Sequence, residues 1–256
     1  MATIALTHLP SPRMNACIRT HAAHEDIDIE RALVQHEAYR AALARAGAEV
    51  RVLETNRDHP DAVFIEDTAI VVDELAVITS MGAESRRDEP RGIEAALAEL
   101  RKTSRIAAPA TIEGGDVARV GRTLLVGRTG RTNDEGIAAL RALVEPCEYR
   151  VVAAEVRDCL HFKTACTALP DGSLLVNRAW VPGAELRSFE LVDVAASEPH
   201  AANVVCVGGH AIMSSAYPRT AEIVAKHARD VLLVDLSEFA KGDGCATCLS
   251  IIVEDR

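Results

Sequence analysis

Short apolar segments joined by tight turns recur along the chain and predict four β-hairpins. In the segments 67–80 and 116–127 the apolar runs are separated by Asp-Glu and Gly-Arg. In 164–177 and 203–215 they are separated by Pro-Asp-Gly and Gly-Gly. Turns of two or three residues between apolar, often β-branched runs are typical of hairpins. We therefore expect each segment to form two antiparallel strands.

Helical patterns alternate with these hairpins. Apolar residues at spacings of three and four predict helices at 29–46, 91–102, 133–145 and 217–230. Asn133 or Asp134 is a suitable N-cap, and Pro218 fits a first helical turn. A short apolar strand is expected after each helix, in the segments EVRVLE, RIAAPA, YRVVAAEV and DVLLVDL.

Hairpin, helix and strand thus recur at intervals of roughly 40 to 50 residues, a period typical of propellers and solenoids. The last apolar segment, CATCLSIIVED, completes a fifth unit if it pairs with TIALTHL near the N-terminus. No polar capping repeat is evident, which favours a closed ring over an open solenoid. We predict one domain of the α/β class, spanning residues 1–256; an ordinary mixed α/β sheet is the alternative.

Composition and charge restrict the classes of partner and cellular location that the protein can have. The formal net charge of −10 argues against a nucleic-acid surface, and an aromatic content of 3% argues against stacking platforms. The first residues lack the pattern of a signal peptide, and no apolar run is long enough for a membrane span. Seven scattered cysteines are unlike a disulfide framework. We expect a cytoplasmic protein with reduced thiols and no nucleic-acid or membrane partner.

The segment KGDGCATCLS raises the question of what Cys245 and Cys248 do. No second Cys-x-x-Cys or His pair completes a zinc site. In an extended segment, residues three apart point to opposite sides. We therefore expect one thiol to face a site while the other packs, instead of a shared metal or a disulfide.

Several charged residues flank the apolar strands. Glu66, Asp67 and Glu113 lie beside apolar residues, where a carboxylate is costly to bury without a partner. Arg86 and Arg131 offer such partners, or a bidentate fork for a carboxylate substrate. His161 is expected at the start of a strand, and its spacing alone favours a structural histidine.

Two common enzyme signatures are missing. No serine lies in a G-x-S-x-G elbow, which argues against a serine hydrolase of that type. The segment GRTGRTND lacks the Gly-Lys-Ser/Thr of a P-loop, and GGH at 208–210 lacks the dinucleotide-binding spacing. A nucleotide site is therefore unsupported.

Taken together, the motifs resemble one known family. FIED, GAESRR, IEGGD, GRTNDEG, LHFKT, HAANV with YPRT, and DGCATCLS are similar, in order, to motifs of dimethylarginine dimethylaminohydrolase. This family belongs to the guanidino-modifying pentein superfamily. The resemblance implies a pentein fold, a five-bladed α/β propeller of repeated ββαβ units, which agrees with the number of units counted above.

The resemblance also implies a cysteine hydrolase that needs no metal and no organic cofactor. Cys248, by its place in T-C-x-S, resembles the nucleophile, and His161, in LH-x-K-T, resembles the acid/base. Glu113 resembles the carboxylate that contacts this histidine and the guanidinium. The implied reaction converts dimethylarginine to citrulline and dimethylamine through a covalent thiouronium intermediate.

Substrate-binding residues follow from the same resemblance. Glu66 and Asp67 resemble an acidic pair that grips the cationic end of the substrate, and Asp61 a further polar contact. Arg86 and Arg131 resemble the residues that hold the amino acid's carboxylate. The implied partner is a methylated arginine or a related guanidino or ureido amino acid, and the implied state is a monomer or homodimer.

Part of the chain departs from the family pattern. The stretch 9–26 corresponds to the family's lid over the pocket but matches it poorly, so no residue here is assigned to the usual lid leucine. Within the superfamily, arginine deiminase and citrullinase remain alternatives, although the retained carboxylates favour a cation over a neutral ureido group. A non-catalytic ring that binds an amino acid is a second alternative.

Overall fold

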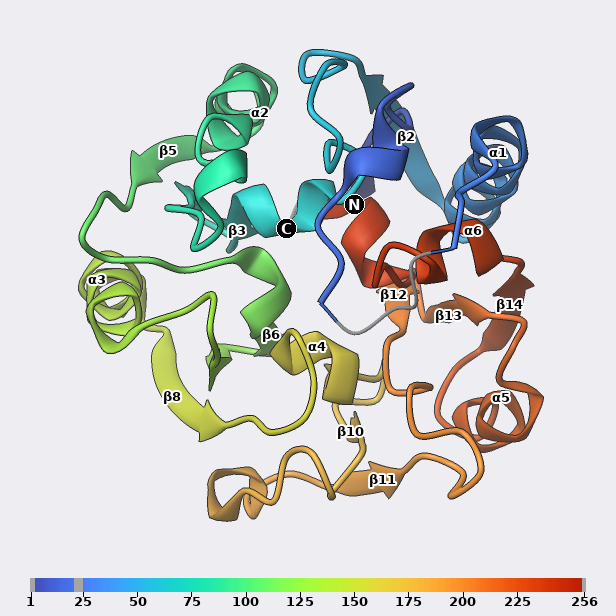
Figure 1. Ribbon diagram of the computed structural model, residues 1–256. Helices are drawn as coiled ribbons and strands as arrows, with labels where there is room; N and C mark the ends of the chain where they lie inside the picture. Colours follow the sequence, from blue (N-terminus) through green and yellow to red (C-terminus); the bar gives the residue numbers. More distant parts are fainter. Residues whose placement is uncertain (1–2, 21–24, 255–256) are drawn as a thin grey trace.

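Five small sheets form a ring. The computed structural model describes residues 3–20 and 25–254. Within these residues the sheets, here called blades 1 to 5, have the strand orders β15-β1-β2, β3-β4-β5, β6-β7-β8, β9-β10-β11 and β12-β13-β14 (Figure 1). The strands are β1 (Thr3–His8), β2 (Ala48–Leu53), β3 (Ala69–Val71), β4 (Leu75–Ile78), β5 (Lys102–Arg105), β6 (Val117–Val120), β7 (Thr123–Arg128), β8 (Arg150–Glu155), β9 (Cys166–Ala168), β10 (Leu174–Val176), β11 (Leu191–Asp193), β12 (Val205–Val207), β13 (His210–Ser214), β14 (Asp230–Val234) and β15 (Ile251–Glu254).

Each blade contains one antiparallel pair and one parallel pair. In blade 3, β6 and β7 form the predicted hairpin, and β8 then pairs with β7 in parallel. The parallel pair requires a crossover, which a helix supplies in four blades. These crossover helices lie on the outside of the ring (Figure 1) and are α1 (Ile29–Arg45), α2 (Glu89–Ala98), α3 (Asp134–Val144) and α5 (Pro218–Val224).

Local sequence explains where the longer helices begin. The Asn133 side chain accepts a hydrogen bond from the Gly136 N–H, and the Asp28 side chain accepts one from the Arg31 N–H. Such N-caps satisfy backbone donors that have no partner in the first turn. Two short helices, α4 (Phe162–Ala165) and α6 (Ser237–Ala240), lie nearer the centre of the ring (Figure 1).

The two ends of the described chain share one blade. Strand β15 pairs antiparallel with β1, with Leu6 opposite Ile251 and Thr3 opposite Glu254. Strand β2 then pairs in parallel with the other edge of β1. The predicted closure of the ring by CATCLSIIVED and TIALTHL is confirmed. The single domain over residues 1–256 stays a prediction.

Five apolar clusters lie where neighbouring blades meet. One packs Leu124 and Val126 of blade 3 against Val77 of blade 2, and another packs Leu174 of blade 4 with Leu125. The remaining clusters join blades 1 and 2, blades 4 and 5, and blades 5 and 1. The hydrophobic core is therefore a ring of interfaces, which leaves the centre to polar groups.

Three predicted segments have other bounds. The helix expected at 91–102 spans Glu89–Ala98, and Lys102 begins β5 instead. The strand expected at RIAAPA is wrong: β5 ends at Arg105, which is paired with Ile78, and Pro109 downstream has no N–H for a ladder. The helix expected at 217–230 ends at Val224, because three-residue turns follow it and lead into β14. In the part of the chain that the structure describes, no helix has the length and apolar character needed to cross a bilayer.

Candidate active site

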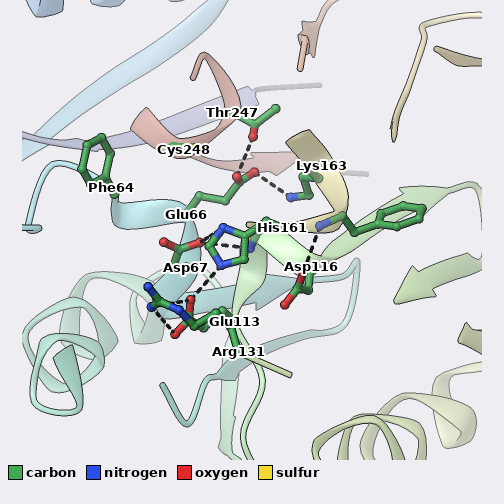
Figure 2. Close-up of polar contacts among 12 residues, drawn as sticks. Phe64, Glu66, Asp67, Glu113, Asp116, Arg131, His161, Lys163, Thr247 and Cys248 are labelled. Atoms are coloured by element: carbon green, nitrogen blue, oxygen red, sulfur yellow. Dashed lines mark hydrogen bonds and ion pairs between the residues drawn. The ribbon is translucent and has the colours of Figure 1, made fainter. Parts of the chain in front are cut away.

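Four short helical segments meet at the centre of the ring. They are η2 (Ile65–Thr68), η4 (Gly114–Asp116), α4 and η7 (Thr247–Leu249). They carry three of the predicted site residues, and two more, Glu113 and His161, directly precede η4 and α4. Each lies directly before, or within a residue of, the first strand of a hairpin or the last strand of the chain. Side chains from blades 1 to 4 therefore converge on one place (Figure 2).

The local structure around Cys248 and His161 differs from the sequence-based expectation. Cys248 lies in the turn η7, not in an extended strand, and the Cys245 N–H donates to Cys248 Sγ at 3.4 Å. The alternation expected for the two thiols therefore does not apply. His161 precedes α4 and does not begin a strand, because the buried Asp116 carboxylate accepts from the Phe162 N–H and turns the chain there.

His161 and Glu113 form a buried ion pair. His161 Nε2 donates to Glu113 Oε2 at 2.8 Å, and Arg131 Nη1 lies 3.3 Å from Glu113 Oε1 (Figure 2). Burial opposes protonation of His161, but the charges of Asp67, Asp116 and Glu113 outweigh it and raise the pKa of the imidazole. Burial likewise opposes ionisation of Glu113, but His161 and the arginines lower the pKa of this carboxyl. Both shifts favour an imidazolium facing a carboxylate.

Arg86 is almost fully buried and bound on all its nitrogen atoms. Its Nη1 donates to Asp67 Oδ2 at 2.7 Å, and its Nε and Nη2 donate to Glu89 Oε2 at 3.0 and 2.9 Å. Nη2 also donates to the Phe64 carbonyl. Burial disfavours the cation, but Glu89 and Asp67 raise the pKa of the guanidinium well above its ordinary value. Arg86 therefore organises protein groups as well as facing the pocket.

Glu66 belongs to a different polar group from Asp67. Its carboxylate accepts from Lys163 Nζ and from Thr247 Oγ1, both at 2.6 Å (Figure 2). Burial raises the pKa of Glu66, although Lys163 and Thr247 oppose this shift. Glu66 lines a cavity of about 390 Å³ together with Lys163 and Thr247. It does not line the pocket that contains Asp67.

Cys248 lines a small pocket together with most of the other predicted residues. The pocket is lined by Cys248, His161, Asp61, Asp67, Arg86 and Arg131, and also by Ile18, Phe64, Leu160 and the turn 242–244. Its free volume is about 20 Å³, far less than an amino acid fills. Burial, together with the negative charge of Glu66, raises the pKa of Cys248 well above the ordinary value of a thiol.

Two lining or supporting residues were not assigned from the sequence. The Ile18 N–H donates to Asp61 Oδ1 at 3.1 Å, which places this apolar side chain where the lid stretch meets the pocket. Residues 21–24 of that predicted stretch lie outside the described residues. Asp116 accepts from Phe162 N and from the hydroxyls of Thr129 and Thr132. Its place in the IEGGD motif was the available signal.

Ligand atoms of Asp67, Glu113 and His161 lie within 4.8 Å of one another, the spacing of a divalent metal site. The surrounding charges favour a protonated His161 over a bound metal ion. A histidine must be neutral to bind a metal, and the pKa of His161 is raised. Arg86 and Arg131 also already neutralise the two carboxylates. The trio is thus better suited to proton transfer than to holding a metal.

Comparison with known proteins shows which family the chain matches. A family model for eukaryotic N,N dimethylarginine dimethylhydrolase matches residues 8–167. N(G),N(G)-dimethylarginine dimethylaminohydrolase of Streptomyces coelicolor is 42% identical over 249 residues, with 96% of this chain and 95% of the relative covered. The chain belongs to the dimethylarginine dimethylaminohydrolase family. The resemblance inferred from the motifs is therefore confirmed.

Further members of the dimethylarginine dimethylaminohydrolase family agree in sequence and fold. The Pseudomonas aeruginosa enzyme is 35% identical, with 88% of this chain and 89% of the relative covered. The structure of a cysteine-to-serine variant of that enzyme with citrulline has a TM-score of 0.93 at 32% identity, covering 99% of this chain and 100% of the other. The N-terminal domain of the arginine dihydrolase ArgZ shares the fold alone, with a TM-score of 0.84 at 21% identity. The predicted five-bladed pentein fold is confirmed.

Proposed function

We propose that this protein is a dimethylargininase: it hydrolyses the guanidino group of an Nω-methylated arginine and releases citrulline and an alkylamine. The observation that carries the proposal is that one pocket is lined by the thiol of Cys248, the imidazole of His161 and the carboxylates of Asp61 and Asp67. Family membership and the citrulline complex of the Pseudomonas aeruginosa enzyme support the same chemistry.

Charge determines which group the pocket receives. Asp61 and Asp67 line it, and Glu113 lies directly behind His161. A planar guanidinium is a poor electrophile, so it has to be held against the nucleophile by such carboxylates. Arg131, which is partly exposed to the pocket, is the better placed of the two arginines to bind the substrate's carboxylate, because Arg86 already has a protein partner on every nitrogen. Glu66 acts from behind the pocket through Lys163 and Thr247.

The first step forms a thioether-like bond to carbon. Because the pKa of Cys248 is raised in the free protein, this side chain is a thiol before the substrate binds. When the cationic guanidinium binds beside it, the positive charge favours the thiolate, and the thiol proton passes to solvent. The thiolate attacks the central guanidino carbon. The carbon–nitrogen bond to the dimethylamino group breaks, and His161 gives its proton to the departing dimethylamine. A cationic thiouronium remains on Cys248.

The second step restores the protein. His161, now neutral, accepts a proton from a water molecule as the water attacks the same carbon. The carbon–sulfur bond breaks, the sulfur of Cys248 takes up the second proton of the attacking water, and the neutral ureido group of citrulline forms, which restores the thiol of the free protein. Glu113 holds the imidazole through both steps and favours the imidazolium that is present before the first step and restored by the second.

Entry of the substrate requires movement at the pocket wall, because the free volume is smaller than an amino acid. Ile18 is the lining residue that comes from the lid stretch, and we propose that the described residues next to it, up to Thr20, move when the substrate binds. The activity needs only a small-molecule substrate as partner. A cytoplasmic location and a monomeric or homodimeric state remain predictions.

The test compares four substrates at one concentration series. Dimethylarginine, monomethylarginine, arginine and citrulline are incubated with the protein, and citrulline, ornithine, ammonia and alkylamines are quantified by mass spectrometry. We expect equal amounts of citrulline and dimethylamine from dimethylarginine. Preferred release of ammonia from arginine would indicate an arginine deiminase, and ornithine from citrulline a citrullinase. Binding without any product would indicate a non-catalytic amino-acid-binding ring.

A variant of the proton carrier adds a mechanistic check. His161→Gly removes the group that protonates the amine and activates water, and a general acid or base contributes roughly 10²–10⁴ in rate. Intact-protein mass spectrometry after incubation with dimethylarginine is expected to show either a persistent adduct on Cys248 or no reaction. Citrulline release at the wild-type rate by folded His161→Gly would remove His161 from the mechanism.

A further inference from the structure

A buried asparagine connects the turn that carries the nucleophile to the helix that follows the proton carrier. We propose that Asn203 is a positioning residue, which fixes Cys248 relative to His161 by clamping the residue before the nucleophile. The effect on turnover rests on the proposed function. The clamp itself is a property of the fold and is testable without turnover.

All three polar positions of the Asn203 side chain are used. Its Oδ1 accepts from the Thr247 N–H at 2.8 Å, and its Nδ2 donates to Thr247 Oγ1 at 3.0 Å. The other Nδ2 hydrogen points to the Lys163 carbonyl at 3.1 Å. Thr247 directly precedes Cys248, and Lys163 lies two residues after His161 in α4. One amide therefore touches both segments.

These bonds are part of a closed cycle. Thr247 Oγ1 accepts from Asn203 and donates to Glu66 Oε2, and Glu66 Oε1 accepts from Lys163 Nζ. Lys163 returns to Asn203 through its backbone carbonyl. The four members come from segments leading into blades 1, 2, 4 and 5. Figure 2 shows the part of the cycle formed by Glu66, Lys163 and Thr247.

The position of Asn203 favours an effect on rate over an effect on substrate binding. Its side-chain bonds reach only Thr247 and Lys163, whereas the pocket carboxylates and arginines are held by bonds of their own, such as that between Asp67 and Arg86. Without the clamp, η7 loses two of its bonds to the rest of the protein and keeps that from Thr247 to Glu66, so we expect it to shift while the groups that bind the substrate stay in place. A displacement of about 1 Å in such a site costs about 10²-fold in rate.

The key variant is Asn203→Ala, and the chain offers a matched control in Asn177→Ala. Asn177 is similarly buried and also bonds two backbone groups: Nδ2 donates to the Pro199 carbonyl at 2.9 Å, and Oδ1 accepts from the Ala179 N–H at 3.0 Å. Neither partner belongs to the site. Both variants lose buried hydrogen bonds, so both are expected to be less stable.

Steady-state kinetics on dimethylarginine distinguishes the two roles. For Asn203→Ala we expect kcat to fall by about 10²-fold while KM and citrulline affinity change less than about 3-fold. For Asn177→Ala we expect kcat close to that of the wild type. Equal kcat losses in the two variants, or unchanged kcat in folded Asn203→Ala, would overturn the positioning role.

A hydroxyl pair tests the same clamp from its other end. Thr247→Val keeps the shape of the side chain but removes the hydroxyl that bonds Asn203 and Glu66, whereas Thr247→Ser keeps it. We expect kcat to fall in Thr247→Val and to stay close to the wild-type value in Thr247→Ser. If Asn203→Ala fails to fold, this pair decides the question: equal kcat values in Thr247→Val and Thr247→Ser would refute the clamp.

Hydrogen exchange provides the arm that does not depend on turnover. Removing Asn203 Oδ1 frees the Thr247 N–H, so its exchange in a peptide covering 244–250 is expected to be faster in Asn203→Ala and unchanged in Asn177→Ala. Unchanged exchange in Asn203→Ala would overturn the clamp. The two proposals can fail separately. If the wild type releases no citrulline, but the Thr247 N–H exchanges faster in Asn203→Ala, the proposed function is refuted and the clamp is supported.

Discussion

Replacing Arg86 by methionine tests how strongly a buried cation organises the site. Arg86 is 4% exposed and bonds the carboxylates of Asp67 and Glu89. Arg86→Met keeps the length of the side chain but leaves both carboxylates buried without this cation. Breaking a buried pair in this way costs about 3–5 kcal/mol, a large share of the roughly 5–15 kcal/mol that a domain has in total.

The assay is urea unfolding at pH 7, with two comparisons that fix the interpretation. The control Arg87→Met removes a neighbouring arginine whose side chain is 57% exposed, and it is expected to cost less than about 1 kcal/mol. Arg86→Met combined with Glu89→Met is expected to be more stable than Arg86→Met alone, because one unpaired carboxylate is gone. A loss for Arg86→Met as small as that for Arg87→Met would refute the reasoning and leave this guanidinium available mainly for a ligand.

Three further predictions concern protonation and close packing. Burial lowers the pKa of His36 to about 3, so stability that is present above pH 6.5 is lost as the pH falls toward 3. In urea unfolding, His36→Leu is expected to reduce the slope of the unfolding free energy against pH by about 1.4 kcal/mol per pH unit in this range, and equal slopes in the variant and the wild type would contradict this. The raised pKa of His161 predicts that kcat falls with rising pH at a pH well above 6.5. Asp116→Asn removes one of the charges that raise this pKa, so it is expected to move the fall in kcat to lower pH. A pH–rate profile that does not move would exclude Asp116 as a cause of the raised His161 pKa. A Cβ at Gly115 would lie 2.7 Å from Asp67 Oδ1 and 2.8 Å from His161 Nδ1, so Gly115→Ala is expected to lower kcat by about 10²-fold in a protein that still folds, as judged by circular dichroism.

The fold was largely predictable because its signals are local and repeated. The hairpin at 116–127 and the helix at 133–145 were predicted from turn residues and apolar spacing. Strand β6 and helix α3 lie within those segments, and β7 extends one residue beyond, to Arg128. The closed ring followed from counting units and from one pairing between the chain ends. The RIAAPA strand was wrong because register with β4, a tertiary effect, decides where β5 ends.

The site was less predictable because long-range hydrogen bonds shape its turns. Asp116 turns the chain after His161 from 46 residues away, and Asn203 holds the turn before Cys248 from 44 residues away. Adjacent residues in sequence also separate: in a 3₁₀-helix each residue advances about a third of a turn, so Asp67 faces the pocket and Glu66 faces the other cavity. The motifs named these residues, but only the fold shows which of them meet.

The most direct test of the account measures citrulline release from dimethylarginine by Cys248→Ser and Cys245→Ser, side by side with the wild type. The Cys245 contact to Cys248 Sγ is made by its backbone N–H, which Cys245→Ser retains. We predict that Cys245→Ser keeps most of the wild-type rate and that folded Cys248→Ser releases no citrulline. Equal losses in the two variants, or turnover by Cys248→Ser, would contradict a single cysteine nucleophile.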